Sequence, residues 1–318
     1  MVDAVEAMAL IESASTPEQL FGTGGKHAYR RLARLVHPDA DPDRGNYPRN
    51  ERAARAFAKL SALWQQYREG GDALVASGDI ATLVRVPGGL LKLARDPADG
   101  DLIGREAVAL RWLAANGDPA YLPYVPRLLE TRRYADPATG VTRRGNVLAE
   151  LSGFVTLEAV QRRFPAGLDP RDVAWIWRRA LVALGLAHRS GLVHGAVLPP
   201  HLSIHPNDHA LCLLDWCYSS RGPNPGTLPA FVARYRSWYP DEVGPGYRPG
   251  PDLDIYLATR SIFSLIREPP QALKAFAAGC TLPNPARRPA DAWELLREFD
   301  DLIERLWGPR RFRPFPAP

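Results

Sequence analysis

Three histidines, His201, His205 and His209, are spaced four residues apart in the stretch "LVHGAVLPPHLSIHPNDHALCLLDW". On a helix this spacing would align three imidazoles on one face, where they could bind Zn²⁺. The intervening Pro206 and the sequence Pro-Asn-Asp instead indicate a turn between two short apolar strands. We therefore predict a β-hairpin with Asp215 emerging at its end, and no zinc site built on the three histidines.

A long helix must precede this hairpin. In "DPRDVAWIWRRALVALGLAHRSG", Asp169 is a good N-cap and Pro170 suits the first turn. The apolar side chains recur at helical spacing, at Trp177, Ala180, Leu181, Leu184 and Ala187.

Motifs around the hairpin resemble those of protein kinases over about residues 72–307. Lys92 in "LLKLAR" matches the strand lysine, and Glu106 in "REAVALRWL" matches the helix glutamate that pairs with it. We expect Asp101 to cap the helix that carries Glu106. Asp215 in "LLDWCYS" matches the metal-binding aspartate of Asp-Phe-Gly.

Three further motifs follow in the order that the resemblance requires. Glu242 in "YPDEV" matches the glutamate of Ala-Pro-Glu, and Asp254 in "DLDIYLAT" matches an aspartate of the central helix of the larger lobe. Arg288 in "LPNPARRPADAWELL" matches the arginine that pairs with that glutamate in the family.

The catalytic loop departs from the kinase pattern His-Arg-Asp-Leu-x-x-x-Asn. The segment "HGAVLPPH" keeps His194, but Gly195 replaces the arginine, Ala196 the catalytic base, and His201 the asparagine that holds a second Mg²⁺. Leu198 stands where a lysine would steady the transferred phosphoryl group. Loss of a positioned base costs about 10² to 10⁴ in rate, so the resemblance implies a pseudokinase.

The resemblance also implies ATP and Mg²⁺ as cofactors, held by Lys92, Glu106 and Asp215 together with Gly78 of a degenerate glycine-rich loop. As structural groups, the first three would be a lysine–carboxylate pair and a strand-end cap. On the sequence both interpretations stay open.

The first seventy residues contain a different pattern. The segment "KHAYRRLARLVHPDADPDRG" predicts an amphipathic helix with a basic face, which ends where Pro38 restricts His37. A second helix is expected from an N-cap at Asn50 through "AFAKLSALWQQY" to Gly70. The two helices would pack antiparallel across an exposed His-Pro-Asp loop.

This arrangement resembles the J-domain of DnaJ-type co-chaperones over about residues 3–70. The family's tripeptide corresponds to His37, Pro38 and Asp39, and its basic face corresponds to Arg30, Arg31 and Arg34. The resemblance implies that this surface docks on a DnaK-type heat-shock chaperone. The usual Tyr-Leu-Gly signature of the first helix is absent, so we expect that helix to be placed differently.

Composition limits the other possibilities. A net charge of +5 and a pI of about 9.2 would suit a nucleic-acid binder, but the arginines are scattered without a basic stripe, so we expect none. Three cysteines without a disulfide framework favour a reducing compartment. The acidic N-terminal segment and the lack of a long apolar run predict a cytoplasmic protein without membrane association.

We therefore expect an α+β protein with a small all-α J-domain-like hairpin at residues 1–71 and a bilobal kinase-like fold at 72–307. A β-rich lobe would cover about 72–150, an α-rich lobe about 151–307, and a solvated Pro/Arg-rich tail 308–318. The predicted function is that of a co-chaperone or adaptor whose pseudokinase domain binds an unknown client protein or senses nucleotide. The alternative is an atypical ATP-dependent phosphotransferase or nucleotidyltransferase, with His194 or His201 as a substitute base.

Overall fold

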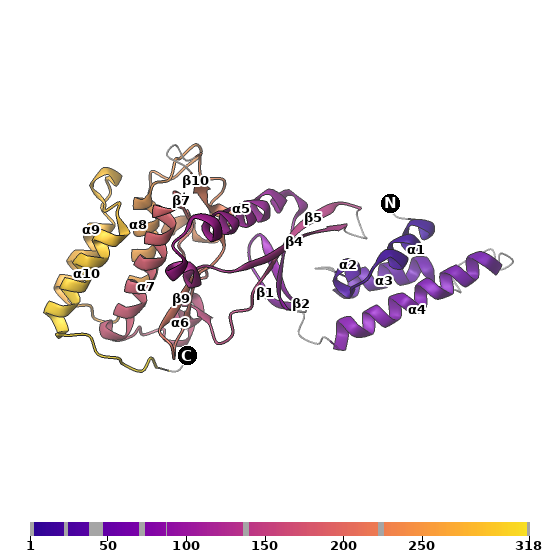
Figure 1. The fold of residues 1–318 in the computed structure, drawn as a ribbon, viewed down its shortest axis with the longest axis horizontal. Coiled ribbons are helices and arrows are strands. Elements are labelled where there is room, and N and C mark those ends of the chain that lie inside the picture. Colours follow the sequence, from indigo (N-terminus) through magenta and orange to yellow (C-terminus); the bar gives the residue numbers. More distant parts are fainter. Residues whose placement is uncertain are drawn as a thin grey trace. The chain divides into compact units, whose positions relative to one another are not determined.

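The computed structural model describes residues 3–21, 25–37, 47–69, 74–86, 88–135, 140–221 and 226–316 (Figure 1). The chain forms two compact units. The first comprises Met1–Gly104 and Leu129–Glu150, and the second Arg105–Leu128 and Leu151–Pro318. The chain combines helices with an antiparallel five-stranded sheet, which is compatible with the predicted α+β class.

Four helices form the N-terminal part of the first unit: α1 (Ala4–Ser13), α2 (Pro17–Phe21), α3 (Gly25–Val36) and α4 (Tyr47–Glu69). Asp3 and Glu6 form a capping box at the start of α1. The expected N-cap at Asn50 is wrong, because α4 begins three residues earlier, at Tyr47, with Pro48 in its first turn, where proline is tolerated.

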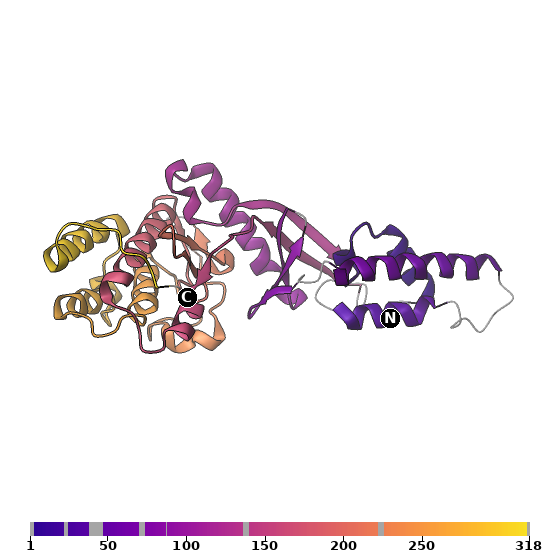
Figure 2. The same ribbon diagram turned by 90° about the horizontal axis from the view of Figure 1, so that it is seen from below.

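The contacts between α3 and α4 establish that they run antiparallel. The ring of Tyr29, early in α3, stacks on Trp64, late in α4, with centroids 4.7 Å apart. At the other end of the pair, the ring of His37 lies edge-on to Phe57 at 4.8 Å. Figure 2 shows the two helices side by side. The predicted helical hairpin is therefore confirmed.

These four helices share a hydrophobic core of their own. Among the described residues, every member of this cluster lies between Ala7 and Tyr67. The buried members are Ala7, Met8, Ile11, Ala14, Leu20, Phe21, Ala28, Leu32, Val36, Ala53, Ala56, Leu60 and Leu63.

A five-stranded sheet makes up the rest of the first unit. Its strands are β1 (Leu74–Ser77), β2 (Ala81–Val86), β3 (Gly89–Ala94), β4 (Leu128–Ala135) and β5 (Thr142–Leu148), in the order β1-β2-β3-β5-β4. Lys92 in β3 lies between Leu83 of β2 and Asn146 of β5 in the register. The predicted strand-turn-strand at residues 81–94 is confirmed.

Helix α5 (Gly100–Asn116) begins differently from the prediction. A 3-10 turn, η3 (Pro97–Asp99), precedes it, and Asp96 caps that turn by accepting a 2.8 Å hydrogen bond from the Ala98 amide. Asp101 therefore lies within the first turn of α5, with 95% of its side chain exposed, and is not a cap. Pro97 sets the helical backbone angle early, which moves the start of the turn upstream.

The second unit is built around α7 (Pro170–Arg189), which packs against α8 (Pro251–Phe263) and α10 (Ala292–Trp307). As predicted, Asp169 caps α7 and Pro170 occupies its first turn. Trp177 of α7 is fully buried against Phe299 of α10. Helices α6 (Leu157–Arg163) and α9 (Gln271–Cys280) also belong to this unit. Short 3-10 turns occur at η4 (Pro119–Tyr124), before β4, at η6 (Ala233–Trp238), before α8, and at η7 (Pro285–Arg287), before α10.

Short strands lie beside α7. The predicted hairpin is present as β8 (Leu202–His205) and β9 (Ala210–Leu213), with β6 (Val155–Thr156) added to β8. A second pair joins β7 (Leu192–Val193) to β10 (Ser220–Arg221). Asp215 follows the end of β9 after one residue, Leu214, as expected.

The C-terminal tail is not the solvated segment that we expected. Phe315 is 8% exposed and lies edge-on to Trp175 of α7. The guanidinium of Arg313 lies 2.7 Å from the Asp172 carboxylate in the first turn of α7. Prolines prevent a helix here but still allow an extended chain to lie along a neighbouring surface.

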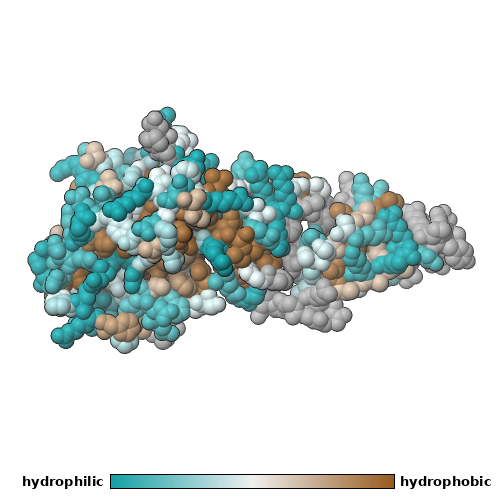
Figure 3. All heavy atoms as spheres, in the orientation of Figure 1, coloured by the Kyte–Doolittle hydropathy of each residue, from teal (hydrophilic) through white to brown (hydrophobic). Residues whose placement is uncertain are grey.

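Hydrophilic side chains cover much of the face shown in Figure 3, and the apolar ones that reach it gather mainly near the strands. Within the described part of the chain, no helix combines the length and apolar character needed to cross a bilayer. All three cysteines are buried, and none of them forms a disulfide.

Candidate functional site

Asp215 occupies a strained position at the end of β9. Its backbone is left-handed, with φ 63° and ψ 65°, a conformation that aspartate tolerates better than most residues. It precedes the 3-10 turn η5 (Trp216–Tyr218), yet its side chain makes no capping hydrogen bond to that turn. The strand-end cap considered from the sequence stays a prediction.

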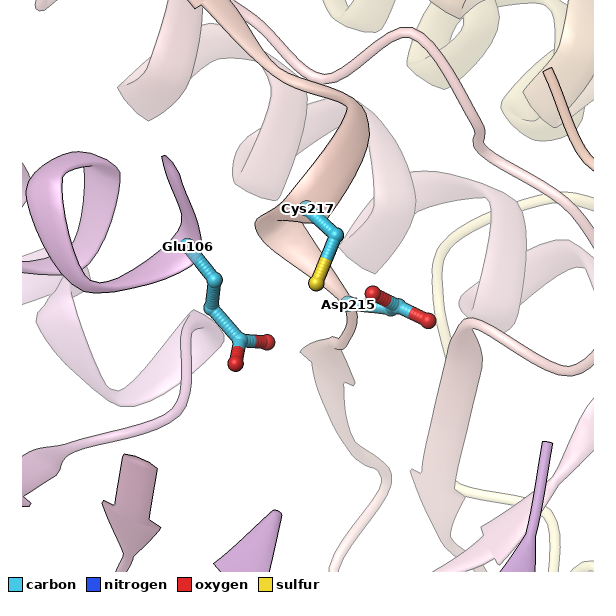
Figure 4. Close-up of side chains that lie close together, drawn as sticks. All are labelled: Glu106, Asp215 and Cys217. Carbon is cyan, nitrogen blue, oxygen red and sulfur yellow. The ribbon is translucent and has the colours of Figure 1, made fainter. Parts of the chain in front are cut away.

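Two other potential ligands gather around this carboxylate. One ligand atom each of Glu106, Asp215 and Cys217 lies within 4.8 Å of the other two. Figure 4 shows Glu106 reaching in from α5, and the Cys217 sulfur between the two carboxylates in that view. Glu106 and Cys217 are fully buried, and the Asp215 side chain is 20% exposed. The sequence predicts Glu106 and Asp215 at one site, but no motif in it indicates Cys217.

His201 approaches the same carboxylate from the segment that follows β7. Its Nδ1–H donates a 2.7 Å hydrogen bond to the Ala196 carbonyl, while Nε2 lies 3.3 Å from Oδ2 of Asp215. Only 9% of the side chain is exposed. The residue that replaces the kinase asparagine therefore faces the residue that matches the metal-binding aspartate.

The other two histidines of the four-residue series lie elsewhere, as the hairpin prediction required. His205 Nδ1 lies 3.1 Å from the Asp208 carboxylate, and the His209 ring stacks on Trp175 at 4.2 Å.

His194 stabilises the loop by hydrogen bonds to backbone groups. Its Nε2–H donates to the Leu214 carbonyl at 2.8 Å, and its Nδ1 accepts from the Ala196 amide at 3.2 Å. Complete burial lowers the pKa of His194 to about 4. Both ring nitrogens are already in hydrogen bonds, so the geometry does not favour His194 as a substitute general base.

Asp254 fixes the backbone of this loop through hydrogen bonds. The buried carboxylate accepts hydrogen bonds from the amides of His194 at 2.7 Å and Gly195 at 2.8 Å, and from Nε2–H of His188 at 3.0 Å. Three donors compensate the cost of burying this charge. Asp254 therefore acts as a structural anchor of the loop.

Packing explains why glycine occupies position 195, which the sequence alone did not indicate. Its φ is 77°, and an added Cβ would lie 2.6 Å from Leu228 Cδ1 and 2.8 Å from the Tyr218 carbonyl oxygen. A side chain here would meet both backbone strain and a close contact. The next residue, Ala196, is fully buried and contributes its carbonyl to His201.

Lys92 and Gly78 belong to the first unit, and Glu106 and Asp215 to the second. Lys92 is buried in β3, with 6% of the residue exposed. Gly78 is exposed, and a Cβ there would only touch the Ala81 carbonyl oxygen at 3.6 Å. The loop geometry therefore does not demand glycine at this position, and the pairing of Lys92 with Glu106 stays a prediction.

One long-range pair expected from the kinase resemblance is present. The Arg288 guanidinium lies 2.5 Å from the Glu242 carboxylate and 3.4 Å from that of Asp252. The Arg288 side chain is fully buried, and its guanidinium also donates to the Leu282 and Pro283 carbonyls.

The predicted docking patch lies at the end of α3. Arg30, Arg34 and His37 are exposed, and His27 extends the same face by one turn. Arg31 is half-buried. Pro38 and Asp39 lie outside the described residues.

No protein-family model matches this chain, and no curated protein matches it. Both family resemblances therefore rest on the residues and contacts of this chain alone.

The donor atoms around Asp215 can be compared with the ligands that the expected Mg²⁺ prefers. Magnesium prefers six oxygen ligands at 2.0–2.1 Å, several of them water. Asp215 and Glu106 offer oxygens, but the other nearby donors are the sulfur of Cys217 and Nε2 of His201. This mixed set suits Mg²⁺ poorly and suits a softer divalent cation better.

Proposed function

We propose that this chain is an adaptor that recruits a DnaK-type heat-shock chaperone through its His-Pro-Asp loop. In this proposal the kinase-like region binds a client protein or senses ATP, and it does not transfer phosphate.

The observation that carries the proposal is the basic face of α3. Arg30 and Arg34 are exposed along one side of the helix, and His37, which directly follows its last residue, is also exposed. The helix is held on α4 by a core of its own. A fixed row of positive charge suits docking on an acidic partner surface, where it sets association rate and register.

The loop around Ala196 supports a binding role for the second region. Ala196 offers no proton acceptor in its side chain, and the His194 nitrogens are committed to backbone partners. The alternative phosphotransferase would have to use His201, whose Nε2 faces Asp215. A loose phosphoryl-transfer transition state depends mainly on positioning and charge, so this alternative is also tested below.

The first experiment measures ATP hydrolysis by a purified DnaK-type chaperone with and without the full-length protein. We expect stimulation by the wild type, a return to the basal rate with His37→Gln, and retention of stimulation with Arg55→Gln. The second substitution is the control, because Arg55 is exposed on α4, outside the docking face of α3. Lack of stimulation by the folded wild type would refute the proposal.

The second experiment incubates the chain alone with labelled ATP and Mg²⁺. We expect no labelled product. A product that disappears in Asp215→Ala would favour the phosphotransferase. A thermal-shift titration with ATP tests the nucleotide-sensing role, because a ligand that binds only the folded form raises the melting temperature.

A further inference from the structure

We propose that Glu106, Asp215, Cys217 and His201 form a binding site for a borderline-soft divalent cation of the Zn²⁺ class. The site goes beyond the adaptor function and does not depend on it. All four residues belong to the second unit.

The spacing of the donor atoms is close to that of a tetrahedral site. With metal–oxygen and metal–nitrogen distances of about 2.0–2.2 Å and a metal–sulfur distance of about 2.3 Å, neighbouring ligands lie roughly 3.3–3.8 Å apart. Glu106, Asp215 and Cys217 have ligand atoms within 4.8 Å of one another. The side chains would therefore rotate toward one another when an ion binds, with His201 Nε2, which lies 3.3 Å from Oδ2 of Asp215, as the fourth ligand.

His201 gives a second, independent indication of a cation. Its Nδ1–H donates to the Ala196 carbonyl, which orients the ring so that Nε2 faces Asp215. A carbonyl partner on one ring nitrogen is typical of histidines that bind metal through the other. An ion bound here would contact both Nε2 of His201 and Oδ2 of Asp215, which lie 3.3 Å apart.

The local backbone is suited to hold the ligands in place. Asp215 and Cys217 flank a single residue at the start of η5, where the left-handed backbone of Asp215 directs its carboxylate away from capping. Non-glycine residues in this conformation often mark functional sites. Glu106 adds a ligand from the middle of α5, so a bound ion would link α5 to η5 (Figure 4).

The chemical type of the donor atoms determines which metal ion the site prefers. Thiolate and imidazole bind Zn²⁺ and Co²⁺ far better than Mg²⁺, which prefers hard oxygen. Four protein donors would also leave little room for the waters that Mg²⁺ retains. The substitution of the kinase asparagine by His201, interpreted from the sequence as a loss, then supplies a ligand for a different ion.

The test uses the full-length protein freed of metal by a chelator and then titrated with Zn²⁺ against a chromophoric competitor. We expect one Zn²⁺ ion per chain, and no displacement by a hundredfold excess of Mg²⁺. Cys217→Ser and His201→Asn should each weaken Zn²⁺ binding at least tenfold. Cys280→Ser is the matched control, a buried cysteine outside the cluster, and should leave affinity unchanged.

A Co²⁺ titration of the wild type gives a readout that does not require any variant to fold. Ligation by Cys217 predicts a thiolate-to-cobalt charge-transfer band, retained in Cys280→Ser. Absence of this band, or Zn²⁺ binding that is unchanged in folded Cys217→Ser, would overturn the proposal.

Discussion

At Gly195 and Ala196, the surrounding atoms restrict which side chain can be accommodated. The backbone of Gly195 is left-handed and lies against Leu228 and the Tyr218 carbonyl, so no larger residue fits without movement. Ala196 is fully buried beside it. The loop is therefore tightly packed, and the Asp254 carboxylate anchors its backbone.

Burial of His194 predicts a pH dependence of stability. Its pKa in the folded protein is about 4, below the ordinary value of 6.5, because burial disfavours the charged ring. Between these values the unfolded chain binds more protons, so the free energy of unfolding should fall as the pH drops from about 6.5 to about 4. The loss from this group should approach roughly 3 kcal/mol.

Urea denaturation at a series of pH values measures this effect. We expect His194→Gln to be less stable at pH 7 but to have a flatter profile between pH 6.5 and 4. His27→Gln, at an exposed site, should keep the wild-type slope. Equal slopes in wild type and His194→Gln would contradict the assignment.

At the scale of elements, the C-terminal tail acts as a strap on the second unit. Phe315 packs against Trp175 of α7, and Phe312 lies against His209 in the β8–β9 turn, with ring centroids 4.6 Å apart. Arg313 lies between them and pairs with Asp172. The tail therefore covers the start of α7 and the hairpin turn together.

The exposed fraction of each tail side chain predicts how much that side chain contributes to the free energy of unfolding. Phe315 is 8% exposed, so Phe315→Ala should lower the free energy of unfolding by about 2 kcal/mol through lost burial. Phe312 is 68% exposed, and Phe312→Ala should cost well under about 1 kcal/mol. Urea unfolding followed by tryptophan fluorescence measures both. Equal effects of the two substitutions would contradict the strap.

At the scale of the whole molecule, the hydrophobic cores are separate. In the described part of the chain, the core of α1–α4 draws its members from Ala7 to Tyr67 alone. The segment contains a capping box, a buried Phe21 and stacked aromatic rings, the features that a small helical domain needs.

This separation predicts that a fragment of residues 1–73 folds alone. We expect a helical circular-dichroism spectrum and a cooperative thermal transition, with modest stability because small domains bury a smaller share of their surface. Leu60→Ala, at a fully buried position, should abolish the transition, whereas Arg34→Ala, at an exposed one, should not. A fragment without a cooperative transition would show that its core needs the rest of the chain.

The amino-acid sequence determined the features that local patterns encode. Apolar periodicity and a cap-plus-proline signal located α7, and turn residues located the β8–β9 hairpin with Asp215 at its end. The kinase resemblance supplied the pair of Glu242 and Arg288. Both resemblances, and the functions that they imply, remain proposals.

Only the tertiary structure decided which distant side chains meet. Cys217 joins Glu106 from a position 111 residues away, and Phe315 lies on Trp175, contacts that no local period encodes. The caps expected at Asn50 and Asp101 failed because prolines nearby start the helices earlier. Local propensity fixes how each segment folds, whereas contacts across long loops depend on how the buried surfaces fit together.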